Sequence, residues 1–403
     1  MGNLHSPTLR TVLVALVLVT PLTSHAQKKY DSGATDTEIK IGNIMPYSGP
    51  ASSYGTIGKA EAAYFQKIND EGGINHRKII FVSADDGYNP SKTVEVTRRL
   101  VEQDEVLLIF NGLGTATNSA TRAYMNSRKV PQLFVASGAT KFGDPKDFPW
   151  TMGFNPAYQT EGAIYAAYIL KHQPNAKIGV LFQNDDFGRD FLKGLKEVLG
   201  NKGATMIVAE VSYEVSDPTV DSQIVTLKGS GADVFLNFST PKAAAQAIRK
   251  AYDIDWKPVQ YLINASASLA TTLTPAGLDK SVGLVTAAYI KDPADSQWDN
   301  DSGMKDYRAF MKKYYPDGAV DGVTVYGYIA AQTLVQVLSQ CGDNLTRENV
   351  MKQAANLRNL QLSMLLPGIA LNTSPTNFYP NRQMRLARFD GKQWVLFGDV
   401  ISN

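Results

Sequence analysis

Cysteine is almost absent from this chain of 403 residues, which contains only Cys341. A single cysteine cannot form a disulfide within the chain, and it excludes metal sites built from several cysteines. The chain also has no large excess of either charge, because 40 lysine and arginine residues nearly balance 38 acidic residues and leave a net charge of +2. Nucleic-acid recognition needs a clustered basic face, so the composition predicts no nucleic-acid partner.

Long apolar runs are missing except near the amino terminus. Residues 11–20 read TVLVALVLVT, with Arg10 before them and Pro21 and the small-residue pattern of 24–26 after them. This order is typical of a secretory signal peptide, and ten apolar residues are too few to span about 30 Å of hydrocarbon. We therefore expect residues 1–26 to be a cleaved signal peptide, with export to the periplasm and no stable membrane insertion.

Known enzyme signatures are also missing. The chain has no G-x-S-x-G elbow, no phosphate-binding G-x-x-x-x-G-K-[ST] loop and no H-E-x-x-H motif. Beyond the signal peptide its only histidines, His76 and His172, lie far apart in the sequence. These observations predict a protein that is not an enzyme and has no metal and no cofactor.

What the chain does contain is an alternation of short β-branched runs with helical patterns, in two series. The predicted strands of the first series are residues 39–45, 78–84, 106–110 and 132–136, with helices at 52–71, 91–103 and 115–128. Those of the second are 177–182, 205–211, 233–238 and 259–263, with helices at 188–199, 219–228, 242–252 and 268–274. Such alternation favours an α/β fold of two doubly wound lobes, with the joint near 150–156.

The last part of the chain is less regular. It contains a predicted strand at 283–289 and a polar, strand-free stretch at 291–303. Helices are predicted at 304–315, 322–340 and 346–356, followed by a hairpin of 384–389 and 393–400 around Asp390–Gly391. The pattern does not indicate which lobe this part joins.

Two loops after predicted strands are rich in small and hydroxyl residues. The first contains Gly114, Thr115, Thr117 and Asn118 at the start of a predicted helix. It departs from a dinucleotide fingerprint because Thr117 replaces the third glycine. Free backbone N–H groups at a helix N-terminus can instead bind a carboxylate, although an ordinary tight turn uses the same residues. The second loop, at 136–140, has similar chemistry.

Several motifs resemble the periplasmic ligand-binding proteins of ABC importers, specifically the branched-chain amino-acid binding family. They are Ile41–Pro50 followed by Tyr54–Gly55, Asn69–Ile74, Asp185–Gly188 and Tyr326–Gly327. The resemblance covers nearly all of the chain after the signal peptide. It implies a type I periplasmic binding protein fold, a monomer that closes on a ligand between its lobes and is recognised by an importer permease. By this likeness lobe one comprises 36–154 and 288–376, and lobe two comprises 155–287 and 377–403.

The resemblance also implies a set of ligand-binding residues. Lobe one would supply a ring that flanks the ligand and two hydroxyl-rich loops, and lobe two would supply a covering aromatic ring and further polar contacts. The residues are Tyr54, Thr115, Thr117, Asn118, Ala136, Ser137, Thr140, Phe187, Ser239 with Thr240, and Asn264.

One departure from the family bears on the ligand. Branched-chain amino-acid binders place a glutamate after the strand matching 259–263, where it pairs with the ligand ammonium. Here Asn264–Ser268 contains no acid. Asp185, Asp186 or Glu161 could substitute, or the ligand has no amine, because an unpaired buried ammonium is costly. We expect an aromatic or other apolar carboxylate, with branched-chain amino acids or a ligand-sensing role as alternatives.

Overall fold

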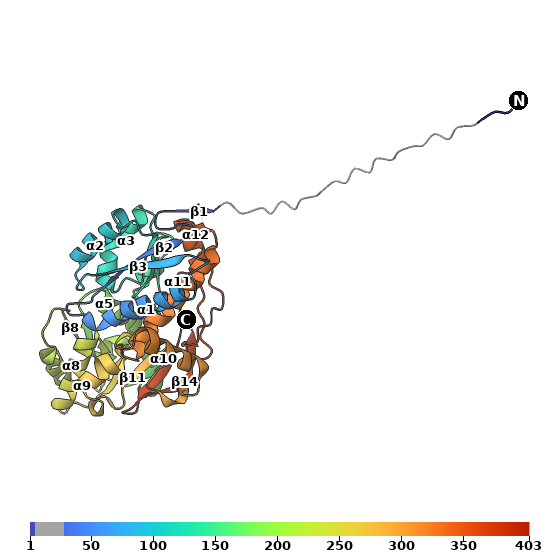
Figure 1. The fold of residues 1–403 in the computed structure, drawn as a ribbon. Coiled ribbons are helices and arrows are strands. Elements are labelled where there is room, and N and C mark those ends of the chain that lie inside the picture. The colour runs from blue at the N-terminus through green and yellow to red at the C-terminus, as the bar shows by residue number, and fades with distance from the viewer. Residues whose placement is uncertain (5–27, 403) are drawn as a thin grey trace.

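The computed structural model describes residues 1–4 and 28–402, so most of the expected signal peptide lies outside the described residues. Two sheets organise the remainder into two lobes, which Figure 1 shows one above the other. We call the part built on the five-stranded sheet the first lobe and the part built on the seven-stranded sheet the second lobe. A short parallel pair, β1 (Lys29–Tyr30) with β12 (Asn344–Leu345), lies outside both sheets.

The first sheet is entirely parallel, with strand order β3-β2-β4-β5-β6. Its strands are β2 (Glu38–Met45), β3 (Lys78–Asp85), β4 (Leu108–Phe110), β5 (Gln132–Val135) and β6 (Thr151–Gly153). The short helix η1 (Ser52–Gly55), α1 (Thr56–Asp70), α2 (Pro90–Glu102) and α3 (Thr115–Ser127) connect them. The four predicted strands and three predicted helices are confirmed, and β6 was not predicted.

The second sheet has strand order β14-β13-β11-β10-β9-β7-β8. Its parallel strands are β7 (Ile178–Gln183), β8 (Ile207–Tyr213), β9 (Val234–Phe238), β10 (Val259–Leu262) and β11 (Val285–Ala288). The hairpin of β13 (Gln383–Phe389) and β14 (Trp394–Ser402) is antiparallel, as the Asp390–Gly391 signal predicts. The helices are α4 (Tyr158–His172), α5 (Asp186–Leu199), α6 (Gly203–Met206), α7 (Asp221–Gly229), α8 (Pro241–Asp253) and α9 (Thr274–Ala276).

Two helical segments differ from the prediction. The helix predicted at 268–274 is present, but Leu269–Leu273 forms a π-helical turn before α9 and not a regular α-helix. Helix α4 was not predicted at all, since it buries residues on more than one face and therefore lacks a clear apolar stripe. It packs closely on α5 because Gly162 faces the backbone of Phe191 and Gly194 faces the backbone of Gln159.

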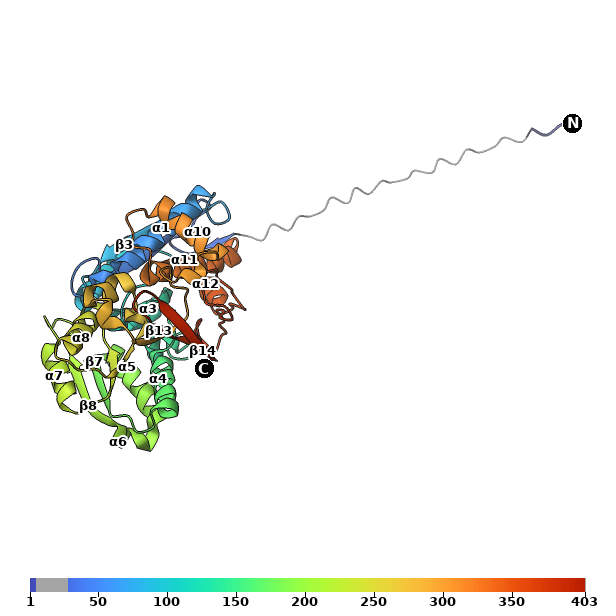
Figure 2. The same cartoon turned by 90° about the horizontal axis from the view of Figure 1, so that it is seen from below.

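The tertiary structure assigns the last hundred residues to both lobes. Helices α10 (Ser302–Tyr314) and α11 (Gly322–Cys341) pack on α1 in the first lobe, and α12 (Arg347–Ala354) packs on α11. The chain then returns to the second sheet with β13, so it passes between the lobes after β6, after β11 and again before β13. Figure 2 shows the second lobe, with α7, β8 and α4, extending away from α1 and α10.

The parallel topology positions the site. Strands β2, β4 and β5 of one lobe and β7, β9 and β10 of the other end in loops that face the space between the lobes. Open α/β sheets bind ligands at such carboxyl ends. Among the residues that the structure describes, no helix is long and apolar enough to cross a membrane.

Candidate ligand-binding site

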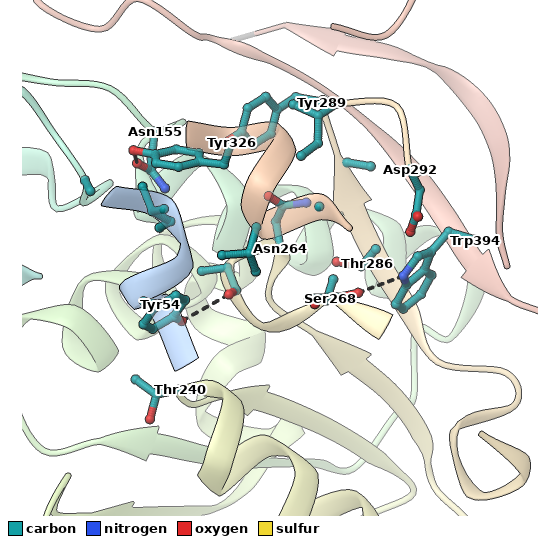
Figure 3. A pocket seen from close by; sticks show the side chains of 18 of the residues that line it. Tyr54, Asn155, Thr240, Asn264, Ser268, Thr286, Tyr289, Asp292, Tyr326 and Trp394 are labelled. Atoms are coloured by element: carbon teal, nitrogen blue, oxygen red, sulfur yellow. Dashed lines mark hydrogen bonds between the residues drawn. The ribbon is translucent and has the colours of Figure 1, made fainter. Parts of the chain in front are cut away.

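A cavity lies between the two lobes, at the carboxyl ends of both sheets (Figure 3). Most of its lining is apolar or aromatic, with a few polar side chains among them. The first lobe contributes residues of η1, α1, the start of α3 and the loop after β5. The second lobe contributes the start of α5, the loops after β9 and β10, and β14, and the crossover after β11 adds further residues. Such a cavity, mostly apolar with a few convergent polar groups, is the usual form of a small-molecule site.

The amino terminus of α3 forms one polar end of the lining. Gly114 has a φ of 103°, a left-handed value that glycine adopts without strain, and it turns the chain from β4 into α3. Thr115 follows, and its Oγ1 lies 2.7 Å from Oγ of Ser137 in the loop after β5. Both hydroxyls are buried beside the first N–H groups of the helix. This is the chemistry of an anion site, because these N–H groups lack partners within the helix.

Aromatic rings surround this end of the cavity. The ring of Tyr158, at the start of α4, lies edge-on to Phe187 with centroids 5.2 Å apart and stacks on Phe191 at 4.4 Å. Burial raises the pKa of Tyr158 to about 12, so its hydroxyl stays protonated beside Ser137 and Thr115. Such a hydroxyl can donate a hydrogen bond to an anion.

Tyr54 connects the lobes directly across the cavity. Its hydroxyl donates a hydrogen bond of 3.0 Å to the carbonyl oxygen of Ala265, in the loop after β10. Figure 3 shows this contact below Asn264. Tyr54 therefore forms a wall of the cavity and also links the lobes in the conformation described here.

The residues expected to bind ligand fall into two groups. Those that line the cavity are Tyr54, Thr115, Ala136, Phe187, Thr240 and Asn264. The others lie behind the lining, among the residues that the structure describes: Thr117, Asn118, Ser137, Thr140 and Ser239.

Most of the second group are engaged by the protein itself. Thr117 Oγ1 donates to the carbonyl of Leu113, and Asn118 Nδ2 donates to the carbonyls of Gly112 and Gly114 at 2.8 and 2.7 Å. These bonds shape the turn into α3. Ser239 Oγ donates to Oδ1 of Asn237, near the end of β9.

The three acids considered as substitutes for the missing glutamate all make hydrogen bonds or ion pairs within the protein. Asp185 caps α5 by accepting from the N–H groups of Phe187 and Gly188, and Asp186 forms an ion pair of 2.5 Å with Lys141. Glu161 is buried in α4.

Glu161 Oε1 accepts hydrogen bonds from the Asn264 N–H at 2.7 Å and from the Tyr165 hydroxyl at 2.6 Å. Burial raises its pKa to about 7. None of the three acids is among the lining residues in the part of the chain described.

Sequence reasoning missed the residues that line the cavity from the crossover segments and the carboxyl-terminal part. They are Asn155 and Tyr158 after β6, Tyr289, Asp292, Asp295 and Trp298 after β11, Tyr326 in α11, and Trp394 and Leu396 in β14. The polar, strand-free character of 291–303 was the only signal for the segment after β11. Within the described residues, no group of three or more His, Cys, Asp or Glu side chains could hold a metal ion.

Comparison with known proteins gives a family. Residues 38–393 match the family model described as periplasmic binding protein. A relative in Brucella abortus (strain 2308), Leu/Ile/Val-binding protein homolog 7, is 23% identical over 372 residues, which cover 89% of each chain. Leu/Ile/Val-binding protein homolog 1 of the same strain is 24% identical and covers 78% of this chain and 82% of its own.

Solved structures show the same fold. A branched-chain amino-acid ABC transporter protein from Thermus thermophilus with bound valine superimposes with a TM-score of 0.81 at 15% identity, covering 92% of this chain and 98% of that one. A substrate-binding periplasmic protein from Ralstonia solanacearum gives 0.79 at 22% identity, covering 91% and 100%. The chain therefore belongs to the periplasmic binding protein family and has its two-lobed type I fold, in which a solute-binding cavity lies between the lobes.

Proposed function

We propose that this protein captures a small carboxylate with an aromatic or other apolar body and delivers it to the permease of an ABC importer. The observation that carries the proposal is the amino terminus of α3, which opens into an otherwise mostly apolar cavity beside Thr115 and Ser137. Helix N–H groups, two hydroxyls and the Tyr158 hydroxyl could together satisfy a carboxylate without a basic side chain. The protein would bind its ligand without changing it.

The apolar body of the ligand would lie against the aromatic walls. Tyr54 and Phe187 both line the cavity, and Tyr289 and Tyr326, labelled in Figure 3, form another part of its surface. Aromatic stacking adds about 0.5–1.5 kcal/mol beyond the burial of apolar area. Among the described lining residues the acids are Asp292 and Asp295, which come from the segment after β11 and not from the loop of Asn264; this supports a ligand without an amine on the carbon beside its carboxylate.

Calorimetry tests this ligand class directly. We would titrate the exported form of the protein with benzoate and 3-phenylpropanoate, and in parallel with leucine, isoleucine and valine. We expect an aromatic acid to bind at least as tightly as the amino acids. Tight leucine binding with no response to any amine-free acid would overturn the ligand class and leave the transport role in place.

Uptake of branched-chain amino acids is the second candidate function. It is favoured by the names of the Brucella relatives, which are Leu/Ile/Val-binding protein homologs. The same titrations distinguish it from the first candidate, because an α-ammonium would need an acid that the lining near Asn264 does not supply.

We propose further that the protein is a monomer exported to the periplasm after cleavage behind Ala26. Amino-terminal sequencing of protein from the periplasm should begin at Gln27, and retention of residues 1–20 would overturn this. The lobe boundaries expected from the sequence, 36–154 with 288–376 and 155–287 with 377–403, are supported by the return of β13 to the second sheet. Limited proteolysis of the ligand-free protein at the crossovers would test these boundaries.

A further inference from the structure

The cavity has a second polar end, away from Tyr54 and Thr240. Figure 3 shows Asp292 and Trp394 on the opposite side of the cavity from Tyr54. Asp292 belongs to the segment after β11, which also contributes Asp295 and Trp298 to the lining, and Trp394 belongs to β14. None of these residues is needed to explain a carboxylate at the start of α3.

Negative charge at this end is not balanced by the lining. Asp292 and Asp295 line the cavity, and no lysine, arginine or histidine does so in the part of the chain described. The neighbouring Lys291 does not line the cavity. Its Nζ forms an ion pair with Asp301 at 2.8 Å and lies 5.1 Å from the ring centre of Trp298. A second anion in this cavity would therefore increase an existing excess of negative charge.

One carboxylate oxygen at this end has no partner in the protein. Asp292 Oδ1 accepts the N–H of Ala294 at 2.8 Å, whereas no described residue donates to its Oδ2. Burial raises the pKa of Asp292 to about 6, with further repulsion from Asp321 and Asp295, so most of the group is still ionised at pH 7.5. Both oxygens of Asp295, by contrast, accept from Gln297.

A buried hydroxyl in the same part of the cavity also lacks a hydrogen-bond partner. Thr286 in β11 is 1% exposed and lines the cavity, yet its Oγ1 makes no hydrogen bond, although it lies close to the Tyr165 hydroxyl. Figure 3 shows Thr286 between Ser268 and Asp292. Buried polar groups are nearly always hydrogen-bonded, so this hydroxyl is a second indication that a polar ligand group lies here.

We infer that this end of the cavity binds the positively charged group of a zwitterionic ligand, an ammonium held by Asp292 and separated by an apolar spacer from the carboxylate at α3. The inference rests on the proposed carboxylate site. Electrostatics favour it, since a zwitterion adds no net charge to a cavity that already holds uncompensated carboxylates. Trp394, which also lines this end, suits the same group because indole faces attract cations.

Matched acids test the inference by calorimetry at pH 7.5. One series is 4-methylbenzoate, 4-(hydroxymethyl)benzoate and 4-(aminomethyl)benzoate, and a longer, flexible one is octanoate, 8-hydroxyoctanoate and 8-aminooctanoate. We expect the amine of at least one series to bind at least tenfold more tightly than its amine-free partner. Asp292→Asn should abolish that preference, whereas Asp299→Asn should preserve it, because Asp299 pairs with Arg308 outside the cavity. Melting temperatures would confirm that both variants fold.

Other outcomes separate this inference from the proposed function. Amine-free acids that bind as tightly as the amines, a preference for the hydroxyl compounds, or a preference that survives Asp292→Asn would each overturn the inference and leave the carboxylate site standing. Binding of 8-aminooctanoate that depends on Asp292 but is unchanged by combining Thr115→Ala with Ser137→Ala would sustain the cation contact and overturn the carboxylate proposal. Failure of every amine to bind would overturn the inference.

Discussion

Asp190 of the second lobe accepts two hydrogen bonds from Thr140 of the first, from its backbone N–H and from its Oγ1, both at 2.7 Å. Asp190 is held for this contact by Gln159, whose Nε2 donates to the other carboxylate oxygen at 2.5 Å. The ion pair of Lys141 with Asp186 lies beside it. Thr140, expected from the sequence to contact ligand, instead joins the two lobes in this conformation.

Removing this contact should weaken ligand binding without touching the cavity. Because the Thr140 bonds exist only when the lobes meet, Asp190→Ala should favour the open form. Losing hydrogen bonds to a charged group costs about 1.5–3 kcal/mol, which predicts roughly ten- to a hundred-fold weaker binding. Calorimetry gives the affinity, and small-angle scattering at saturating ligand should show a less compact particle.

Glu197→Ala is the control for that experiment. Glu197 lies on the same helix, α5, and forms only an exposed pair with Lys193 at 3.7 Å. Exposed pairs of this kind contribute little, so affinity and scattering should match the unaltered protein. Equal affinity for Asp190→Ala and Glu197→Ala would show that the contact does not contribute to closure.

The paired hydroxyls at the start of α3 should act together. Thr115→Ala and Ser137→Ala should each weaken carboxylate binding by about 1.5–3 kcal/mol. Because Thr115 Oγ1 and Ser137 Oγ bond to each other, either change also releases the other hydroxyl. The double variant should therefore lose less than the sum of the two single losses, as measured in a double-mutant cycle by calorimetry. Unchanged affinity in the double variant would place the carboxylate elsewhere.

Glu161 should make stability depend on pH. Its pKa rises from 4.5 to about 7 on folding, because burial disfavours the carboxylate. Between about pH 4.5 and 7 the unfolded chain loses this proton while the folded protein keeps it, so the free energy of unfolding should fall as pH rises. The full loss from this group is about 3 kcal/mol.

Glu161→Gln isolates this contribution. Glutamine retains an oxygen to accept from Asn264 N–H and Tyr165 but cannot ionise. Urea unfolding from pH 4.5 to 8 should show the variant gaining stability relative to the unaltered protein as pH rises, with the gain levelling off above pH 7. A difference that does not vary with pH would contradict the raised pKa.

Close packing of α4 on α5 should make Gly162 intolerant of a side chain. A Cβ there would overlap the backbone oxygen of Phe191, so Gly162→Ala should destabilise the protein by about 1–3 kcal/mol. Gly229, at the end of α7, has nothing within 4 Å of an added Cβ, and Gly229→Ala should be neutral or stabilising by up to about 1 kcal/mol. Urea unfolding of both variants checks the contrast, and equal stabilities would contradict the packing argument.

Local sequence pattern was enough to predict the strands of the two sheets, except β6, and the two-lobed class of fold. Strands such as Glu38–Met45 and Val234–Phe238 are short, apolar and followed by helical patterns, and that information is local. Sequence pattern did not predict α4, because burial on more than one face of this helix removes the periodic signal. It also could not assign the carboxyl-terminal helices and hairpin to a lobe. Those placements depend on contacts between residues hundreds of positions apart.

The same distinction applies to the site. Thr115 could be selected from the sequence, because a hydroxyl beside a glycine turn at a helix start has a local chemical meaning. Asp292 and Trp394 carry no such signal: one lies in a polar loop and the other on a strand more than a hundred residues later. Only the crossover after β11 and the return of β14 to the second sheet bring both side chains into one cavity. Sequence pattern reports which faces must be buried, whereas the packing of the two lobes decides which side chains meet between them.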